Sequence, residues 1–237
     1  MARNTQNKAF VKQALLLSLP FAWMSIFNTV FDSLMPIIAT APVAEGGLGY
    51  NDLVKGVIMA IDNILALFLF PLFGALSDKS RNRFGKRTPF ILFFSSATII
   101  VWIFAGLTLG LSVRWLFIVL LSVTLSFNSM SRPAGLALLP DITPMSKRRS
   151  ANAVAQIAAI VATVIGVALC ELKILGFQYI FYIDSALIAV LIAVFAAKVR
   201  ENKLRRDFDA LPEDEKKPAP EDRAFRFRRR PCERKTQ

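Results

Sequence analysis

Six long apolar runs follow one another along this chain and leave almost no sequence for a separate soluble domain. They cover, approximately, Gln13–Ala39, Leu53–Leu76, Pro89–Leu109, Trp115–Leu139, Ala151–Leu172 and Phe177–Val199. A helix needs about 20 apolar residues to cross the hydrocarbon core of a bilayer. Because 54% of the residues are hydrophobic, lipid is the expected solvent. The sequence therefore predicts an all-α membrane protein with six transmembrane helices.

The apolar runs divide the chain into three parts. Residues 1–12 are predicted to be a short N-terminus, 13–199 the helical bundle, and 200–237 a basic tail. The N-terminus lacks the short apolar core and small-residue exit of a cleavable signal, so the first run is expected to stay as a helix. The tail is charged, contains proline and has no apolar periodicity, which predicts disorder.

The end of the tail, from Arg223, is rich in arginine, with Phe225 and Phe227 interleaved. Basic residues near a membrane surface attract anionic lipid. We expect no nucleic-acid partner, because the tail is tethered to a membrane and a solvated charge run is the ordinary explanation.

Orientation follows from the basic residues, which gather in alternate connections. One set consists of Arg3, Lys8, Lys12, Lys79, Arg81, Arg83, Lys86, Arg87, Lys147, Arg148, Arg149, Lys198, Arg200, Lys203, Arg205 and Arg206. The other connections hold only Glu45, Asp52, Arg114, Glu171 and Lys173. The positive-inside rule therefore places both termini in the cytoplasm, and we expect the protein in the plasma membrane.

Several function classes find little support. The chain has no histidine, and its two cysteines, Cys170 and Cys232, form no CxxC motif. No metal site, disulfide framework or cofactor is predicted. The acidic residues are scattered over different helices, so an intramembrane enzyme is not expected.

The segment GALSDKSRNRFGKRTPF, Gly74–Phe90, sets a charged connection between two apolar runs. Gly74 and Asp78 are four residues apart and share a helix face, so that a neighbouring helix can approach the glycine. Asp78 can then meet either a helix N-terminus or a guanidinium. Gly85 permits a chain reversal. The alternative is a short basic loop that only fixes topology, which is the simpler explanation for Lys86 taken singly.

This segment resembles the loop between the second and third helices of the major facilitator superfamily. The pattern, in a long form similar to the sucrose-transporter and glycoside-pentoside-hexuronide:cation symporter branch, consists of Asp78, Arg83, Gly85, Lys86, Arg87, Pro89 and Phe90. Two further stretches, Met59–Asp78 and Arg132–Val154, are similar to members of that branch. The resemblance implies the N-terminal six-helix half of that fold and a secondary transporter that couples a proton or cation to a sugar or glycoside.

The resemblance also implies a conformational latch that braces one half of the transporter against the other. Its residues here are Gly74, Asp78, Arg83, Gly85, Lys86, Arg87 and Asp141. The family has two six-helix halves, and this chain resembles the first. We therefore expect a truncated carrier, or a half that pairs with a second half or a second copy. The alternative is a non-transporting half-size protein that associates with or regulates a full-length carrier.

Charged residues inside the apolar runs suggest function, because charge in hydrocarbon is costly. Asp62 lies deep in the second run, where burial disfavours the charged carboxylate, and is the candidate for ion coupling, with Asp32 as the second. A sodium site of the melibiose-carrier type is not expected, because Ala66 and Phe70 stand where that type carries acids. Asp32 and Asp184 lie near the outer ends of their runs and either face water or belong to a site.

Six polar residues in the apolar runs are candidates for binding the cargo: Asn28, Asn63, Asn128, Arg132, Asn152 and Gln156. Each has an alternative. Asn63 can join Asp62 in an interhelical hydrogen bond, Arg132 can reach Asp78 or Asp141 as part of the latch, and Asn152 and Gln156 can hold helices together. An aromatic stripe, Trp23, Phe27 and Phe31, either stacks on a sugar ring or packs in the core.

Overall fold

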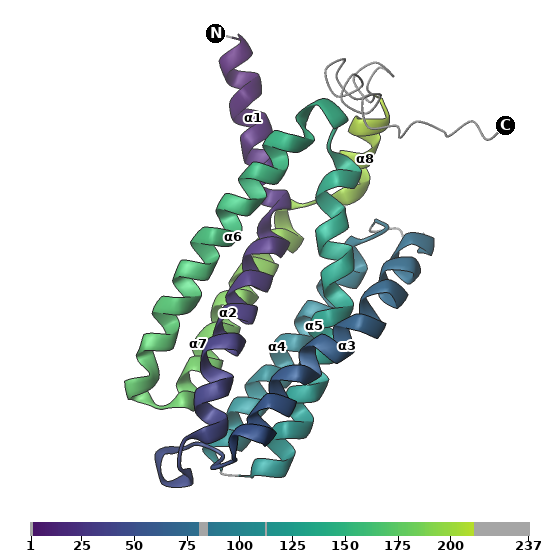
Figure 1. The fold of residues 1–237 in the computed structure, drawn as a ribbon. Helices are drawn as coiled ribbons and strands as arrows, with labels where there is room; N and C mark the ends of the chain where they lie inside the picture. Colours follow the sequence, from purple (N-terminus) through teal and green to yellow (C-terminus); the bar gives the residue numbers. More distant parts are fainter. Residues whose placement is uncertain (1, 81–84, 112, 211–237) are drawn as a thin grey trace, which may run out of the picture.

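The computed structural model describes residues 2–80, 85–111 and 113–210, and the elements in these ranges are helices (Figure 1). The α-helices are α1 (Ala2–Leu17), α2 (Leu19–Thr40), α3 (Asp52–Lys79), α4 (Thr88–Gly110), α5 (Arg114–Ile142), α6 (Arg148–Cys170), α7 (Phe177–Lys198) and α8 (Glu201–Asp209). Short 3₁₀ helices occupy Val43–Glu45, Met145–Lys147 and Glu171–Leu175. Six helical segments are long and apolar enough to cross a membrane, which confirms the predicted fold class.

The first helical segment begins before the predicted span, because the chain is helical from Ala2, whereas the stretch apolar enough to cross a membrane begins at Phe10. A single break at Ser18 separates α1 from α2. Pro20 follows the break and has no amide hydrogen for the ladder, while the Ser18 hydroxyl donates to the carbonyl of Leu15 (2.7 Å). The segment predicted as a short N-terminus is therefore continuous with the first helical segment.

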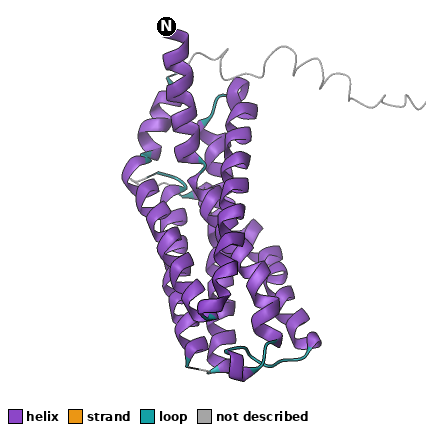
Figure 2. Cartoon of the chain, turned by 90° about the vertical axis from the view of Figure 1, so that its left-hand side faces the viewer, coloured by secondary structure: helices purple, strands orange, loops and turns teal. Residues whose placement is uncertain are grey.

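The spanning helices run side by side along the length of the molecule (Figures 1 and 2). α5 packs against α3 and α4, α7 packs against α4 and α2, and α6 packs against α2. If α2, α3 and α4 are exchanged in that order with α5, α6 and α7, each of these packed pairs is replaced by a packed pair. The pair α2–α6 becomes α5–α3, and the pair α4–α5 becomes α7–α2. The packing thus has the symmetry of a three-plus-three inverted repeat, although the residues show no repeat.

A buried aromatic group holds α2, α4 and α7 together. The ring centroid of Trp102 on α4 lies 4.3 Å from that of Phe181 and 5.0 Å from that of Phe27. Gly106 makes room for this packing, since a Cβ there would lie 2.8 Å from the Cβ of Phe181. Small residues at such positions let membrane helices approach closely.

The outer helices turn apolar side chains away from this core. Leu67 and Phe68 on α3 are 70% and 68% exposed, and Val164 on α6 is 64% exposed. Such faces suit lipid or another apolar helix.

One end of the bundle carries the N-terminus, the end of α3, the start of α4, the α5–α6 connection and α8 (Figure 1). We call it the basic end, after the lysines and arginines that gather there.

The structure differs from the prediction just after the last span. α8, Glu201–Asp209, is a helix inside the segment predicted to be disordered. The reason is a tertiary contact of Glu201, described below, which the composition of the tail does not reveal. The remainder of the predicted tail, 211–237, lies outside the described residues.

Candidate functional site

Four polar side chains from α2, α3 and α5 meet in pairs inside the bundle. We call Asn28, Asp62, Asn128 and Arg132 the polar cluster. A guanidinium nitrogen of Arg132 lies 3.8 Å from Oδ2 of Asp62. The amide of Asn128 donates to the side-chain oxygen of Asn28 at 3.3 Å.

Asp62 is the least satisfied member of the polar cluster. Its side chain is 19% exposed, and its Oδ1 is buried with no hydrogen-bond partner among the described residues. A carboxylate that is half-paired inside a membrane bundle is costly. This position can therefore gain from a proton or from a polar ligand.

The structure corrects one interpretation of Arg132. Its guanidinium faces Asp62 and not Asp78 or Asp141, so the suggestion that it belongs to the latch is wrong. The reason is height along the bundle: Arg132 lies more than two turns before Asp141 on α5, and its side chain points back toward the N-terminus of its helix.

The remaining candidates for ion coupling and cargo binding are more exposed. Asp32 is exposed and lies one turn beyond Asn28 on α2. Asn63, Asn152 and Gln156 are exposed, and within the described part of the chain their side chains make no hydrogen bond. The structure does not bring these three into the polar cluster.

The aromatic stripe of α2 is part of the core. Trp23 meets Phe195 edge to face with centroids 5.5 Å apart, Phe27 packs on Trp102, and Phe31 is 2% exposed. These contacts agree with the packing alternative.

Asp184 does not face water. It is fully buried between α4 and α7, where the indole nitrogen of Trp102 donates to its Oδ2 at 2.9 Å. Its position near one end of an apolar run gave no sign of this, because the partner lies on another helix.

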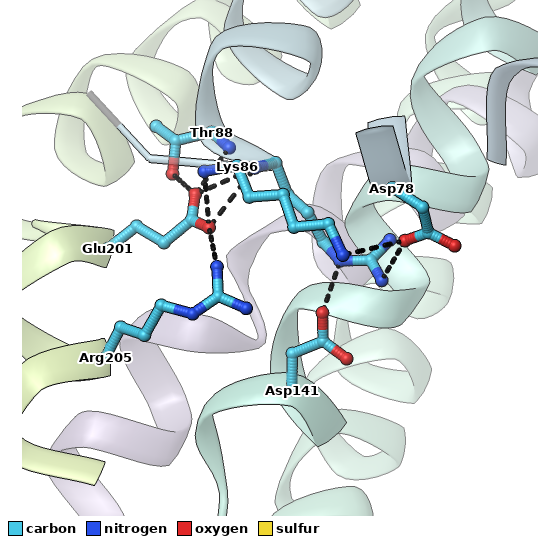
Figure 3. A network of polar contacts seen from close by, with 7 residues as sticks. Asp78, Lys86, Thr88, Asp141, Glu201 and Arg205 are labelled. Carbon is cyan, nitrogen blue, oxygen red and sulfur yellow. Dashed lines mark hydrogen bonds and ion pairs between the residues drawn. The ribbon is translucent and has the colours of Figure 1, made fainter. Parts of the chain in front are cut away.

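A second polar group lies at the basic end, centred on Arg87. We call Asp78, Lys86, Arg87 and Asp141 the Arg87 cluster. Nε of Arg87 donates to Asp141 at 2.6 Å, and its terminal nitrogen donates to Asp78 at 2.8 Å. Lys86 adds an ion pair to Asp78 at 3.2 Å (Figure 3). Of the two partners considered for Asp78, the guanidinium is the one observed.

Glu201 is the residue that sequence reasoning missed. Its carboxylate is 3% exposed and accepts hydrogen bonds from the backbone amides of Lys86 (2.8 Å), Arg87 (3.0 Å) and Thr88 (2.8 Å). The Thr88 hydroxyl also donates to it at 2.8 Å (Figure 3). A carboxylate at a helix N-terminus satisfies amides that lack intrahelical partners and complements the helix dipole. Glu201 therefore ties α8 to the start of α4.

Gly85 is required for this contact. Its φ is +124°, and a Cβ there would lie 2.6 Å from Cδ of Glu201. This agrees with the predicted chain reversal and adds a steric reason for it.

Gly74 is different, because a Cβ there would lie 3.6 Å from Pro133, an ordinary contact. α5 therefore lies against α3 at Gly74, but the approach is not so close that it requires a glycine. Arg83 lies outside them. The described residues hold no group of three or more His, Cys, Asp or Glu side chains arranged to bind a metal ion.

The chain is similar in sequence to known proteins. The family model of the Major Facilitator Superfamily matches residues 21–232, nearly the whole chain. The chain belongs to the major facilitator superfamily. Members of this family are membrane transporters, and the spans described above fit such a membrane protein.

A relative of known function is the human (Homo sapiens) protein named Proton-associated sugar transporter A. It is 34% identical over 99 residues, which are 42% of this chain and 12% of the relative. The match thus spans about an eighth of the relative's length. No solved structure matches the chain significantly.

Proposed function

We propose that this major facilitator superfamily chain forms half of a secondary active transporter that couples a proton to a sugar or glycoside. The observation that carries the proposal is the Asp62–Arg132 pair inside the bundle, beside the Asn28–Asn128 hydrogen bond. The name of the human relative, a proton-associated sugar transporter, supports the cargo and the ion. The pattern around Gly85 supports the sugar-symporter branch of the family.

The proposed coupling is an exchange of partners on Arg132. When Asp62 is ionised, its charge pairs with the guanidinium 3.8 Å away. When Asp62 takes up a proton, Arg132 loses its counter-charge and can donate to cargo hydroxyls together with Asn28 and Asn128. Cargo then binds best to the protonated form, which is the linkage that a symporter needs.

Binding measurements test this without requiring a complete transport cycle. Purified chain in nanodiscs is titrated with a panel of radiolabelled sugars and glycosides over a range of pH, and proton uptake is recorded. We expect cargo binding to be accompanied by proton uptake. Asp62→Asn keeps the shape and loses the titratable proton, so binding should become independent of pH.

Asp52→Asn is the matched control, because it removes an acid from the exposed start of the same helix. If Asp62→Asn left both the affinity and its pH dependence unchanged, Asp62 would be a packing residue and the coupling proposal would be wrong.

The exposed apolar faces of α3 and α6 favour a second bundle as partner. Alternating access is the rocking of one bundle against another, so this chain alone should transport weakly. Ion-driven uptake should appear when a second six-helix half is supplied or two copies assemble. Strong uptake by vesicles that contain only the monomeric chain would contradict this view.

The same faces suit the alternative function, in which the chain associates with a full-length carrier and regulates it. Co-purification with a larger homologue, together with absence of cargo binding by the chain alone, would favour that alternative.

We also propose that the basic end faces the cytoplasm, from the positive-inside rule. A single cysteine placed at Asn82 should then react with an impermeant thiol reagent only when the reagent is given access to the cytoplasmic side of the membrane. Labelling of intact cells from outside would show that the basic end faces outward and that the proposed topology is wrong.

A further inference from the structure

A cavity of about 790 Å³ opens at the basic end, between the start of α4, the end of α7 and α8. One wall is apolar and is formed by Pro89, Leu92, Ala196 and Val199. Leu92 is the fifth residue of α4 and Ala196 lies in the last turn of α7. The cavity therefore adjoins the ends of two helices that are long and apolar enough to span a membrane.

The opposite wall is basic. Arg200, Lys203 and Arg206 line the cavity, are exposed, and are spaced by three along the start and body of α8. Residues three apart on a helix are neighbours on its surface. None of the three forms an ion pair with a side chain that the structure describes, and Asp207 and Asp209 are not among those side chains.

Glu201 also lines the cavity, but its charge is already engaged. Its carboxylate accepts from three backbone amides and from the Thr88 hydroxyl, and Arg205 lies 3.9 Å from it. Arg205 is the ion-pair partner of Glu201, so among the described side chains the three cations on the cavity wall stay in excess. An apolar wall beside an excess of basic charge is complementary to one class of molecule.

We propose that this cavity binds one anionic phospholipid of the adjoining leaflet. The lipid phosphate lies among Arg200, Lys203 and Arg206, and an acyl chain runs along Leu92 and Ala196 between α4 and α7. Basic residues near a membrane surface attract anionic headgroups, and a free anion would leave the apolar wall unused. Because Glu201 joins α8 to the start of α4, a lipid held here also stabilises the Glu201 contact. The proposal is independent of cargo and coupling ion.

The test uses the full chain in nanodiscs of phosphatidylcholine with or without phosphatidylglycerol, followed by native mass spectrometry of retained lipid. Wild type should retain phosphatidylglycerol in preference to phosphatidylcholine. The variant R200Q/K203Q/R206Q should lose this preference by roughly 100-fold, about fivefold per charge. Ala196→Trp, which fills the apolar wall and keeps every charge, should weaken retention as well. Equal thermal unfolding temperatures for the variants and wild type show that they are folded.

The matched control is R228Q/R229Q/R230Q, which removes the same charge from the C-terminal segment beyond the described residues. Retention that fell equally in this control would mean bulk attraction by the basic chain, and the proposal would be wrong.

Two further outcomes would also overturn it. One is inorganic phosphate displacing the lipid while Ala196→Trp has no effect, which would make this a free-anion site. The other is binding that appears only after Glu213, Asp214 and Glu215 are neutralised, which would make the acidic part of the chain's own C-terminal segment the occupant.

Discussion

Replacing Glu201 with alanine is expected to destabilise the basic end of the bundle. The substitution leaves the amides of Lys86, Arg87 and Thr88 and the Thr88 hydroxyl without their acceptor. Loss of a helix cap costs about 1 kcal/mol, and loss of hydrogen bonds to a charged group costs about 1.5–3 kcal/mol. Because the contributions of neighbouring contacts are not additive, we expect a total of about 2–4 kcal/mol.

For a chain of this length, 1 kcal/mol shifts the unfolding temperature by about 2–4 °C. Glu201→Ala should therefore lower the unfolding temperature in detergent by roughly 4–16 °C, measured by intrinsic tryptophan fluorescence. Glu201→Gln keeps one acceptor oxygen and should lose about half as much. Glu171→Ala is the control, because Glu171 is 74% exposed and its ion pair with Lys173 is 4.0 Å long.

A double-mutant cycle with Thr88→Val isolates the side-chain hydrogen bond. If Glu201 and Thr88 interact as observed, their effects are not additive, with a coupling of about 1 kcal/mol. An unfolding temperature for Glu201→Ala equal to that of Glu171→Ala, or additive effects in the cycle, would refute the role assigned to Glu201.

Three other changes have clear expectations. Arg132→Gln leaves the Asp62 carboxylate without its partner and should cost about 3–5 kcal/mol. Adding Asp62→Asn removes that unpaired charge and should recover most of the loss, and thermal melts that show simple additivity would contradict the pair. Gly85→Ala should destabilise by about 2 kcal/mol or more, from its positive φ and the clash with Glu201, whereas Gly74→Ala should be tolerated; equal melts for the two would be inconsistent with the structure. Trp102→Phe keeps the ring but removes the donor to Asp184 and should cost about 1–3 kcal/mol, while Trp115→Phe, at a side chain 69% exposed, should change the melting temperature little.

The spans could be predicted from the sequence because each depends on local composition. An apolar run of sufficient length forms a helix in lipid whatever its neighbours are. The predicted runs Leu53–Leu76 and Pro89–Leu109 lie within α3 and α4. The turn at Gly85 was also predictable, since glycine adopts positive φ at no steric cost.

Contacts between distant segments were less predictable. Asp78 and Asp141 were the acids expected within reach of Arg132, and only helix packing decides that Asp62 is its partner. Glu201 follows the last apolar run like an ordinary charged residue, and its partners lie 113 to 115 residues earlier in the chain. The buried position of Asp184 depends in the same way on Trp102 from α4. Pairwise partners of this kind leave no periodic signal in a single sequence.

The two polar groups that bear on function are attached to the same pair of helices. Asp62 and Asp78 lie on α3, and Arg132 and Asp141 lie on α5. Inside the bundle, Arg132 of α5 faces Asp62 of α3 directly. At the basic end, Arg87 bridges Asp78 of α3 and Asp141 of α5. The acids on α3 are about 24 Å apart along the helix axis, so Asp62 and Arg87 are far beyond contact distance. Because both connections link α3 to α5, releasing one removes part of the restraint on any movement of α3 against α5. Under the proposed coupling, a change of protonation at Asp62 and a change at the Arg87 cluster would therefore both act on the contact between α3 and α5, and this would link ion binding to opening of the basic end.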